Sequence, residues 1–556
     1  MTGQSPAVIT TGLMKRAWSK PEGPDPNLAQ AKYFAAAFSA IAGLFIIFRL
    51  TRKLYINHRR NNGHESSENS LVKGVRSVYE VSTSKLIFGY NGGLVLLYLA
   101  YWAINVVLYL TNVSLNNLHA VGSRLGWMAV LNLVIVIFLS LKHTPLALLS
   151  VSSYEKLLPL HKVAGYTTII AAWAHGILNF KYFSDLGLLN AVVEEDGLLA
   201  GVLGIIGFAV IGISTFPWLM KGGYEVFYVL HFLLTLFVII VIGLHKSIIA
   251  EKVLIVILLI ASMTFVDRAL RFGKLVYYSF GNYATLTALP GGATRVRLHC
   301  SINAKQASHA YLWIPSIRLI QTHPFTLVST NPVEFVVREH DGFTRDLHRK
   351  AQQVGPEAKL RVSLNGPYGA PTEDFTAYDD VVLVAGGSGG SFTFPVALDL
   401  VRRRQQAKED KQARIRIVWA VRTKDALNWY RYELEELISS GIVEVKLYMS
   451  MLQGTSSSNN SVPSSSASSR PNLQDAEKRN HGNSFLGVKI EEGRPDLDSL
   501  LNDFIDEAGP SRRVIVGACG PRSFMNIVHA HASRNAGNGE GAVVTYYNEV
   551  YLFIIW

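Results

Sequence analysis

The chain has 556 residues, of which 49% are hydrophobic and 17% are charged, and its mean hydropathy is +0.22. Soluble domains carry about 25% charged residues, so this composition excludes an ordinary soluble enzyme. The two cysteines, Cys300 and Cys519, exclude a disulfide scaffold, a four-cysteine zinc site and an all-cysteine iron–sulfur cluster. The net charge of +12 comes without a basic helix or an aromatic-rich basic patch, so we expect membrane loops to account for it and no nucleic-acid partner.

The first half of the sequence contains apolar stretches of about 20 residues, the length that crosses a bilayer as a helix. The seven stretches cover residues 33–50, 87–110, 125–149, 158–180, 197–219, 224–245 and 251–267. No basic start followed by an apolar core is present at the N-terminus, so we expect no cleavable signal peptide. The pattern predicts an N-terminal segment over 1–32 and a polytopic α-helical membrane domain over 33–270.

Lysine and arginine collect after the first stretch and after the seventh, which predicts that both of these segments are cytoplasmic. The basic residues are Arg52, Lys53, Arg59, Arg60, Lys73, Arg76, Lys85, Arg268, Arg271 and Lys274. The loop after the second stretch contains the sequon Asn112–Val113–Ser114. The loop after the fourth stretch is acidic, with Asp185, Glu194, Glu195 and Asp196 against Lys181. We expect both loops outside, where glycosylation is allowed.

The pattern changes in the second half to that of a soluble module. From about residue 283, short alternating strands with glycine and proline turns predict an antiparallel β-barrel domain over 280–372. Near residue 380 an apolar strand, a glycine-rich turn, an amphipathic helix and a second strand predict a parallel α/β domain over 378–556. Within that domain, residues 452–483 are polar and rich in serine, so we expect a disordered insertion.

Four histidines lie inside the apolar stretches, where ionisable groups are costly and call for a functional reason. His161 and His175 share the fourth stretch, and His231 and His245 share the sixth. Both intervals are 14 residues, about four helical turns or 21 Å, so each pair lies on one face of its helix. A serial topology makes the two helices parallel. His161 then faces His231 near the cytoplasm, and His175 faces His245 near the outside.

Two facing imidazoles at each level are able to ligate one haem iron from both sides. Six-coordinate iron has no position for a substrate, so this arrangement predicts two stacked haems that carry electrons across the bilayer. Two other interpretations stay open. The histidines could form interhelical hydrogen bonds or touch headgroups, or they could serve a proton-coupled transporter, although a transporter does not explain the soluble half.

Two motifs in the soluble half point to nucleotide chemistry. Residues 323–327 read HPFTL at the end of a predicted strand, and residues 386–390 form a glycine-rich turn between a strand and a helix. Such a turn suits a dinucleotide pyrophosphate, although it does not satisfy the GxGxxG pattern. With these motifs, the chain from about residue 85 onward resembles the ferric reductase and NADPH oxidase superfamily, and most closely the fungal plasma-membrane ferric reductases.

The resemblance implies an FAD site in the barrel domain. The residues that would cradle the flavin are His323, Pro324, Phe325, Thr326 and Leu327, with Thr326 near the edge of the ring. Gly342 and Thr344 would open a short helix under the FAD pyrophosphate, where Gly342 permits close approach and Thr344 caps the helix. A turn between the flavin and nicotinamide domains would be formed by Gly366, Pro367, Tyr368 and Gly369.

The resemblance also implies an NADPH site in the α/β domain. Its residues would be Gly386, Gly387, Ser388, Gly389, Gly390, Arg422, Cys519, Gly520 and Pro521. Arg422 stands where such domains hold the adenosine 2′-phosphate, and a guanidinium suits that dianion, which favours NADPH over NADH. Cys519 would help to place the hydride-bearing ring. Thr326 and Cys519 are therefore the candidate catalytic residues.

The activity implied is that of a multi-pass plasma-membrane ferric-chelate reductase for iron uptake. NADPH would reduce FAD in the cytoplasm, and two b-type haems would pass electrons to external ferric chelates, with cupric ion allowed as a second substrate. The alternative within the superfamily is a superoxide-generating NADPH oxidase, which the equal intervals of 14 residues disfavour. The resemblance allows membrane lipid and a ferroxidase or iron permease as partners.

Three features stay open within this resemblance. Phe237 could be the family's aromatic between the haem levels or a packing residue. Arg124 could pair with haem propionates or mark the headgroup boundary. The C-terminal tail departs from the family because it is longer and more apolar, so which of its aromatic residues covers the flavin is undecided. The tail residues concerned are Glu549, Tyr551, Phe553 and Trp556.

Overall fold

The computed structural model describes most of the chain. The described residues are 25–62, 85–87, 90–145, 154–190, 196–245, 251–369, 371, 373–407, 414–451, 484–509, 512–535 and 542–548. The chain forms two compact units, the first mainly Asn69–Leu270 with the residues up to Tyr55, and the second mainly Arg271–Ile555. The predicted insertion 452–483, the acidic residues Glu194 and Glu195, and the tail residues Glu549, Tyr551, Phe553 and Trp556 lie outside the described residues.

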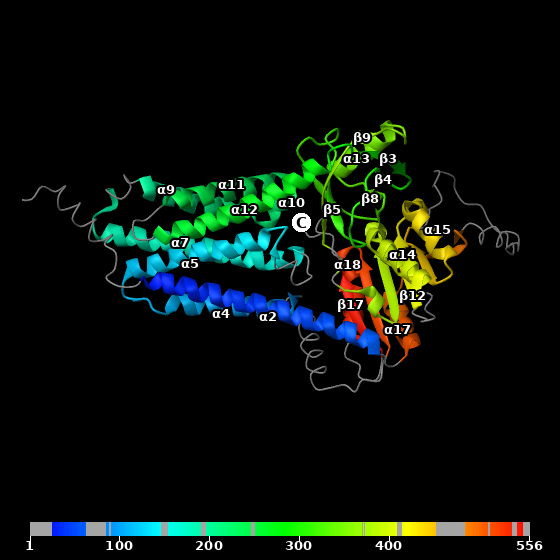
Figure 1. Ribbon diagram of the computed structural model, residues 1–556, viewed down its shortest axis with the longest axis horizontal. Coiled ribbons are helices and arrows are strands. Elements are labelled where there is room, and N and C mark those ends of the chain that lie inside the picture. The colour runs from blue at the N-terminus through cyan, green and yellow to red at the C-terminus, as the bar shows by residue number, and fades with distance from the viewer. Residues whose placement is uncertain are drawn as a thin grey trace, which may run out of the picture. The chain divides into compact units, whose positions relative to one another are not determined.

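Long helices build the first unit (Figure 1). They are α2 (Pro26–Asn62), α4 (Gly92–Leu110), α5 (Leu118–Ser140), α7 (Leu158–Asp185), α9 (Asp196–Ser214), α11 (Tyr224–Leu244) and α12 (Glu251–Tyr277), with the short α10 (Pro217–Gly222), a 3₁₀ turn (Tyr154–Leu157) and the hairpin β1 (Lys85–Ile87) and β2 (Tyr90–Asn91). A common apolar core joins α5, α7, α9, α11 and α12. Large apolar side chains such as Ile255, Leu258 and Phe265 of α12 face outward, as lipid contact requires.

Six of the helices in the described part of the chain are long and apolar enough to cross a membrane: α2, α4, α5, α9, α11 and α12. The sequence predicts seven such segments, and the remaining one is α7. With 28 residues, α7 is about 42 Å long, which is sufficient to span a bilayer. Polar side chains, among them His161, Lys162, His175 and Lys181, are spread along α7, so it contains no long segment as apolar as those of the other six helices.

The predicted stretch 125–149 is displaced from the helix that forms. α5 begins at Leu118 because the side chain of Asn117 accepts a hydrogen bond from the Ala120 amide and caps the helix. It ends at Ser140. The amides of Lys142 and His143 then donate to the buried carboxylate of Asp267 on α12, each at 3.1 Å. The amides of Lys142 and His143 therefore have their hydrogen-bond acceptor on α12 and not within α5.

The second unit begins with two antiparallel sheets around one core, which confirms the antiparallel fold predicted for this region. One sheet has the order β7-β8-β4-β3-β9 and the other β10-β5-β6. The strands are β3 (Tyr283–Leu289), β4 (Ala293–Leu298), β5 (His309–Trp313), β6 (His323–Thr326), β7 (Ser329–Thr330), β8 (Val333–Arg338), β9 (Leu360–Arg361) and β10 (Ser363–Tyr368). One helix, α13 (Phe343–Gln353), follows β8.

A seven-stranded sheet of order β14-β15-β13-β12-β11-β16-β17 forms the rest of the unit. The strands are β11 (Asp380–Gly386), β12 (Arg414–Val421), β13 (Val443–Met449), β14 (Ser484–Phe485), β15 (Val488–Glu492), β16 (Arg513–Cys519) and β17 (Val543–Asn548), and the helices are α14 (Gly390–Ala407), α15 (Arg431–Ser439), α17 (Leu497–Ala508) and α18 (Arg522–Asn535). The strand pairs β13–β12, β12–β11, β11–β16 and β16–β17 are all parallel. The strand order reverses at β11, which is where open α/β sheets bind ligands.

Candidate functional site

The structure brings the four intramembrane histidines together as two facing pairs. His161 and His175 lie on α7, His231 lies on α11, and His245 follows the last residue of α11. The ring centres of His161 and His231 are 6.5 Å apart, and those of His175 and His245 are 6.2 Å apart. Both pairs expected from the sequence are therefore formed.

This spacing fits two imidazoles bound to opposite sides of one iron ion. With metal–nitrogen distances of about 2.0–2.1 Å and ring centres about 1.1 Å beyond each nitrogen, two such rings lie about 6.3 Å apart. In the described part of the chain, no hydrogen bond joins the two rings of either pair. The rings are thus close enough to share a metal ion. The interhelical hydrogen bonds that these histidines do form run to backbone carbonyls of neighbouring helices.

Three of the four imidazoles are held by a backbone carbonyl of a neighbouring helix. The Nδ1–O distances are 2.9 Å from His161 to Val136, 2.7 Å from His175 to Gly122 and 2.7 Å from His245 to Gly197. A carbonyl only accepts hydrogen bonds, so Nδ1 of each ring carries the proton. Nε2 therefore keeps its lone pair for a metal, which is the arrangement that orients histidine ligands in proteins.

Glycines make room for the imidazoles of His175 and His245. A Cβ atom on Gly126 of α5 would lie 2.7 Å from Nδ1 of His175, and one on Gly201 of α9 would lie 2.6 Å from Nδ1 of His245. Each of these glycines lies four residues after the glycine whose carbonyl accepts the imidazole proton. α5 and α9 therefore each place two glycines, four residues apart, against the imidazole that they contact.

Arg124 and Phe237, which the sequence left undecided, both contact neighbouring helices. Arg124 is buried, and all three of its guanidinium nitrogens donate to protein oxygens. The acceptors are the side chain of Asn27 and the carbonyls of Leu108, Thr111 and Asn112. This arginine ties α2 and the end of α4 to α5, which does not support a role in binding propionates. The ring of Phe237 packs 3.4 Å from the Cβ position of Gly207 on α9.

In the barrel domain, the HPFT residues form strand β6 beside an aromatic residue that the sequence reading missed. Thr326 and Leu327 are buried. The ring of His323 stacks on Phe343 at 4.2 Å with an interplanar angle of 16°, and Phe325 lies 6.1 Å from the same ring. Phe343 directly follows Gly342 in the sequence DGFT. This position beside a predicted site residue was the signal that could have identified Phe343. Stacked rings of this kind suit a flat aromatic ligand.

The capping role expected of Thr344 is wrong. The residue before α13 is Gly342, with φ of +77°, and no side chain caps the helix. The Thr344 hydroxyl instead donates to the His340 carbonyl at 3.0 Å and accepts from the His340 amide at 2.8 Å, because Thr344 lies one residue inside the helix. The first amides of α13 therefore have no side-chain cap, which favours an anion at this end.

The segment Gly366–Gly369 is also not the expected turn. Gly366, Pro367 and Tyr368 belong to strand β10, with an irregular register after Asn365. A Cβ atom on Gly366 would lie 2.7 Å from Cβ of Ala310 on β5, so glycine is needed for close strand packing. Only Gly369, with φ of +63°, turns the chain.

The glycine-rich turn and the Cys519–Pro521 segment lie in contact at the ends of adjacent parallel strands. Gly386 ends β11 and Cys519 ends β16. A Cβ atom on Gly389 would lie 2.1 Å from the Cys519 carbonyl oxygen, and one on Gly386 would lie 2.9 Å from Cδ of Pro521. α14 begins at Gly390, so its amide end faces the point where the strand order reverses. The thiol of Cys519 belongs to a fully buried residue.

Three basic groups gather beside this turn. Nη1 of Arg338, at the end of β8, lies 3.9 Å from the Cβ position of Gly387. Burial and the nearby charge of Arg422 lower the pKa of Arg338, and burial followed by Arg338 and Arg422 lowers the pKa of His340. Charges of one sign held this close favour a bound anion. Arg338 and His340 were missed because only folding brings the barrel beside Arg422.

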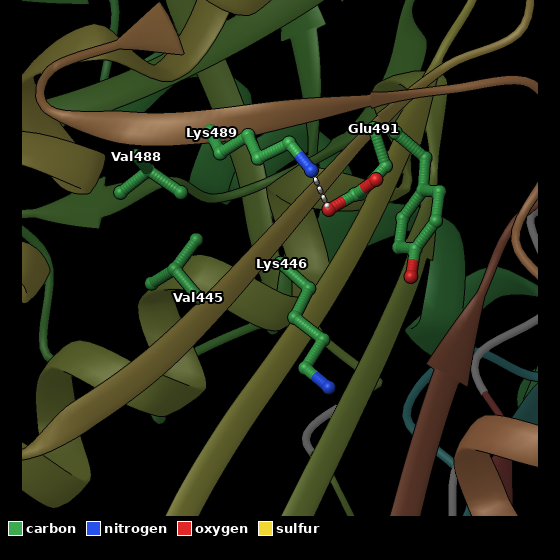
Figure 2. Close-up of a pocket in the computed structure, with 6 residues that line it drawn as sticks. Val445, Lys446, Val488, Lys489 and Glu491 are labelled. Carbon is green, nitrogen blue, oxygen red and sulfur yellow. Dashed lines mark ion pairs between the residues drawn. The ribbon is translucent and has the colours of Figure 1, made fainter.

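A separate hollow of about 290 Å³ lies on the outer part of the α/β sheet (Figure 2). It is lined by Val445, Lys446, Tyr448, Val488, Lys489 and Glu491. Strands β13 and β15 are paired only over Leu447–Met449 of β13. The side chain of Lys489 is paired with Glu491 at 3.2 Å. None of the predicted site residues lines this hollow.

Three family models match successive parts of the chain. Residues 125–242 match the ferric reductase like transmembrane component, residues 282–372 an FAD-binding domain, and residues 378–533 the ferric reductase NAD binding domain. These matches agree with the order of the helical unit, the antiparallel domain and the α/β domain.

Curated fungal relatives carry corresponding names. The probable cell surface ferric reductase kap2 of Aspergillus oryzae is 28% identical over 59% of this chain and 46% of its own length. In Schizosaccharomyces pombe, ferric reductase transmembrane component 1 is 26% identical over 76% of this chain and 79% of its own length. Ferric/cupric reductase transmembrane component 2 of the same organism is 25% identical over 74% of this chain and 77% of its own length. The match thus spans less than half of the Aspergillus relative and over three quarters of the other two.

Proposed function

Because the chain belongs to the ferric reductase family, with a transmembrane component followed by FAD- and NAD-binding domains, we propose that it is an NADPH-dependent ferric-chelate reductase. In this proposal it takes electrons from cytoplasmic NADPH and delivers them to ferric chelates outside the plasma membrane. Cupric ion is a second substrate, in line with the name of one relative.

The observation that carries the proposal is the pair of facing histidines at each of two levels. The spacings of 6.5 and 6.2 Å fit two haem irons, and haem supplies a one-electron carrier when it is bound. His161 and His231 would hold the inner group, and His175 and His245 the outer one. The backbone bonds of three of these rings keep Nε2 directed for ligation.

The soluble residues have complementary roles in the proposal. His323, Phe325 and Phe343 would provide the aromatic wall for the flavin, with the Thr326 hydroxyl at its polar edge. The uncapped amides of α13 would bind the FAD pyrophosphate. The close packing of Gly389 on Cys519 supports a dinucleotide that lies over the ends of β11 and β16, with Cys519 beside the nicotinamide.

Arg422 is the residue that would select NADPH over NADH. It is exposed directly after β12, and its charge acts on Arg338 and His340. A 2′-phosphate dianion would relieve the repulsion in this basic group, which supports the preference for NADPH.

The test is reduction of a membrane-impermeant ferric chelate by intact cells that express the chain, with and without superoxide dismutase and oxygen. We expect reduction that dismutase and anaerobiosis leave intact, and its loss in His175→Ala at equal protein level. Abolition by dismutase or by removal of oxygen would identify an oxidase instead. No chelate reduction and no superoxide would favour a transporter.

A further inference from the structure

The glycine-rich turn between β11 and α14 packs on a cluster of three aromatic rings. Phe394 lies on α14, Trp419 lies on β12, and Tyr430 is the last residue of the 3₁₀ helix Lys424–Tyr430. The ring centres are 5.0–5.6 Å apart, and all three residues are fully buried. A Cβ atom on Gly390 would lie 2.7 Å from the rings of Phe394 and Tyr430. The first residue of α14 therefore lies directly against this aromatic cluster.

Two members of the cluster also bind the carbonyl groups of the turn. Nε1 of Trp419 donates to the Gly387 carbonyl at 2.9 Å. The Tyr430 hydroxyl lies 3.1 Å from the Ser388 carbonyl oxygen and 2.6 Å from the Ser391 hydroxyl. The Ser391 hydroxyl is itself 3.0 Å from the Ser388 carbonyl oxygen. Because these three oxygens share two protons, the Ser388 carbonyl accepts at least one of them in every arrangement.

The direction of these carbonyls fixes the direction of the amides in the turn. The peptide bonds here are trans, so the C=O and the N–H of one peptide unit point to opposite sides. Because the Gly387 carbonyl points to Trp419, the Ser388 N–H points away from the cluster. The Gly389 N–H does the same because the Ser388 carbonyl points to Tyr430. Successive amides directed to one side, next to the amide end of a helix, favour binding of an anion.

We propose that Trp419 and Tyr430 are positioning residues for the pyrophosphate of the nicotinamide dinucleotide, an inference that rests on the proposed function. Both are fully buried, so they act through the turn and not on the nucleotide. They hold two carbonyl oxygens, which would repel phosphate, toward the interior and thereby present the amides that attract it. NADPH and NADH share the pyrophosphate. Trp419 and Tyr430 therefore set the affinity for both cofactors, whereas Arg422 distinguishes one cofactor from the other.

The experiment measures oxidation of NADPH and of NADH by the purified full-length holoprotein, with ferricyanide as the electron acceptor. Trp419→Phe keeps an aromatic ring in the cluster but removes the N–H. We expect KM to rise by the same factor, about 2- to 10-fold, for both cofactors, with kcat unchanged. Trp429→Phe is the matched control. The buried indole of Trp429 donates to the Pro290 carbonyl at 2.8 Å, which is not part of the turn, so its loss should leave both KM values unchanged.

Tyr430→Phe is a second variant that removes a single oxygen atom. The Ser391 hydroxyl still reaches the Ser388 carbonyl in this variant, so we expect KM for both cofactors to rise by a smaller factor than in Trp419→Phe. The melting temperature of every variant is recorded. Trp419→Phe and Trp429→Phe lose the same ring volume, so a comparison of the two separates the loss of packing from the loss of the bond to the turn.

The outcomes distinguish this inference from the proposed function. An unchanged KM in Trp419→Phe or in Tyr430→Phe would overturn the inference while the reductase proposal stands. So would an equal rise in Trp419→Phe and Trp429→Phe, or a rise confined to NADPH. If the unmutated protein oxidises neither cofactor, both proposals fail. If Trp419→Phe does not fold, the KM values of Tyr430→Phe decide the question.

Discussion

At the scale of single residues, the imidazoles of His175 and His245 lie directly against helix backbone at glycines. Gly126 and Gly201 leave a space that one methyl group would fill, since their Cβ positions fall within 2.7 Å of the rings of His175 and His245. Both rings are half-buried and have fixed backbone partners, so they have little freedom to move aside. The glycines are therefore as important to the histidine geometry as the hydrogen bonds.

Replacement of Gly126 by alanine is expected to displace the His175 ring and reduce the occupancy of the outer haem about 10–100-fold. The measurement is haem per chain in purified protein, from the reduced absorbance spectrum. Gly165→Ala on α7 is the matched control, because nothing lies within 4 Å of its Cβ position. Normal haem content in Gly126→Ala would show that the glycine does not shape the site.

Replacement of Arg422 by alanine tests selection of the cofactor. A charge-assisted hydrogen bond contributes about 1.5–3 kcal/mol, so kcat/KM for NADPH is expected to fall roughly 10–100-fold. The value for NADH should change little because NADH lacks the 2′-phosphate. Arg402→Ala, which removes an exposed arginine paired with Glu436, is the control. An equal loss with both cofactors would contradict the assignment.

The basic group around His340 predicts a dependence on pH. Burial, Arg338 and Arg422 lower the pKa of His340 below its ordinary 6.5, so its protonation destabilises the cofactor-free fold as the pH falls below 6.5. A bound phosphate reverses this effect because it favours the imidazolium. KM for NADPH should therefore decrease as the pH is lowered from about 7.5 to about 6, while His340→Gln should show a flatter profile. The same profile in both proteins would exclude His340.

Among single residues, the sequence was informative where local spacing decided the geometry. The 14-residue intervals place two histidines on one helix face, and the pairs form. Phe343 and Arg338 were missed because their roles come from contacts with His323 and Arg422, which are distant in the sequence. Thr344 was misassigned because the helix starts at Phe343, two residues earlier than a threonine cap at 344 would require.

At the scale of elements, a buried ion pair joins strand β4 to helix α15. Arg295 donates to both carboxylate oxygens of Glu433 at 2.8 Å and to Glu334 at 2.6 Å. Burial alone would lower the pKa of Arg295, but the bonds and charges of these two carboxylates raise it. The indole of Trp429 adds a bond to the Pro290 carbonyl at 2.8 Å. These contacts fix the antiparallel domain against the α/β domain.

Loss of this pair should be costly. Glu433→Gln leaves the Arg295 charge buried with Glu334 alone, and removal of one partner of such a pair costs about 3 kcal/mol or more. We expect the temperature of flavin release to fall by roughly 6–12 °C. Glu436→Gln on the same helix breaks an exposed pair with Arg402 and should cost less than about 1 kcal/mol. Similar shifts in the two variants would show that the buried pair does not stabilise the module.

Element types were more predictable than their ends. Apolar length identified the spanning helices, but polar side chains made α7 less apolar than its neighbours, and the Asn117 cap and Asp267 set the ends of α5. The glycine–proline pair at 366 and 367 suggested a turn. It lies in β10 because Gly366 allows close approach to β5, a contact that local sequence does not reveal.

At the scale of the whole molecule, the chain combines an apolar helical unit with a soluble unit of two domains. The helical unit supplies paired imidazoles at two levels. The soluble unit supplies an aromatic wall, uncapped helix amides and the basic group of Arg338, His340 and Arg422. Neither half alone accounts for transfer of electrons from a nicotinamide to an acceptor across a membrane. The proposed activity therefore requires that the helical unit carries electrons.

The most direct measurement is the absorbance spectrum of the purified chain, with haem quantified, before and after addition of NADPH under anaerobic conditions. We expect two b-type haems per chain, both reduced by NADPH, and loss of the outer one in His175→Ala with partial survival of the inner one. A chain that carries FAD but no haem, or haems that NADPH does not reduce, would overturn the proposed function.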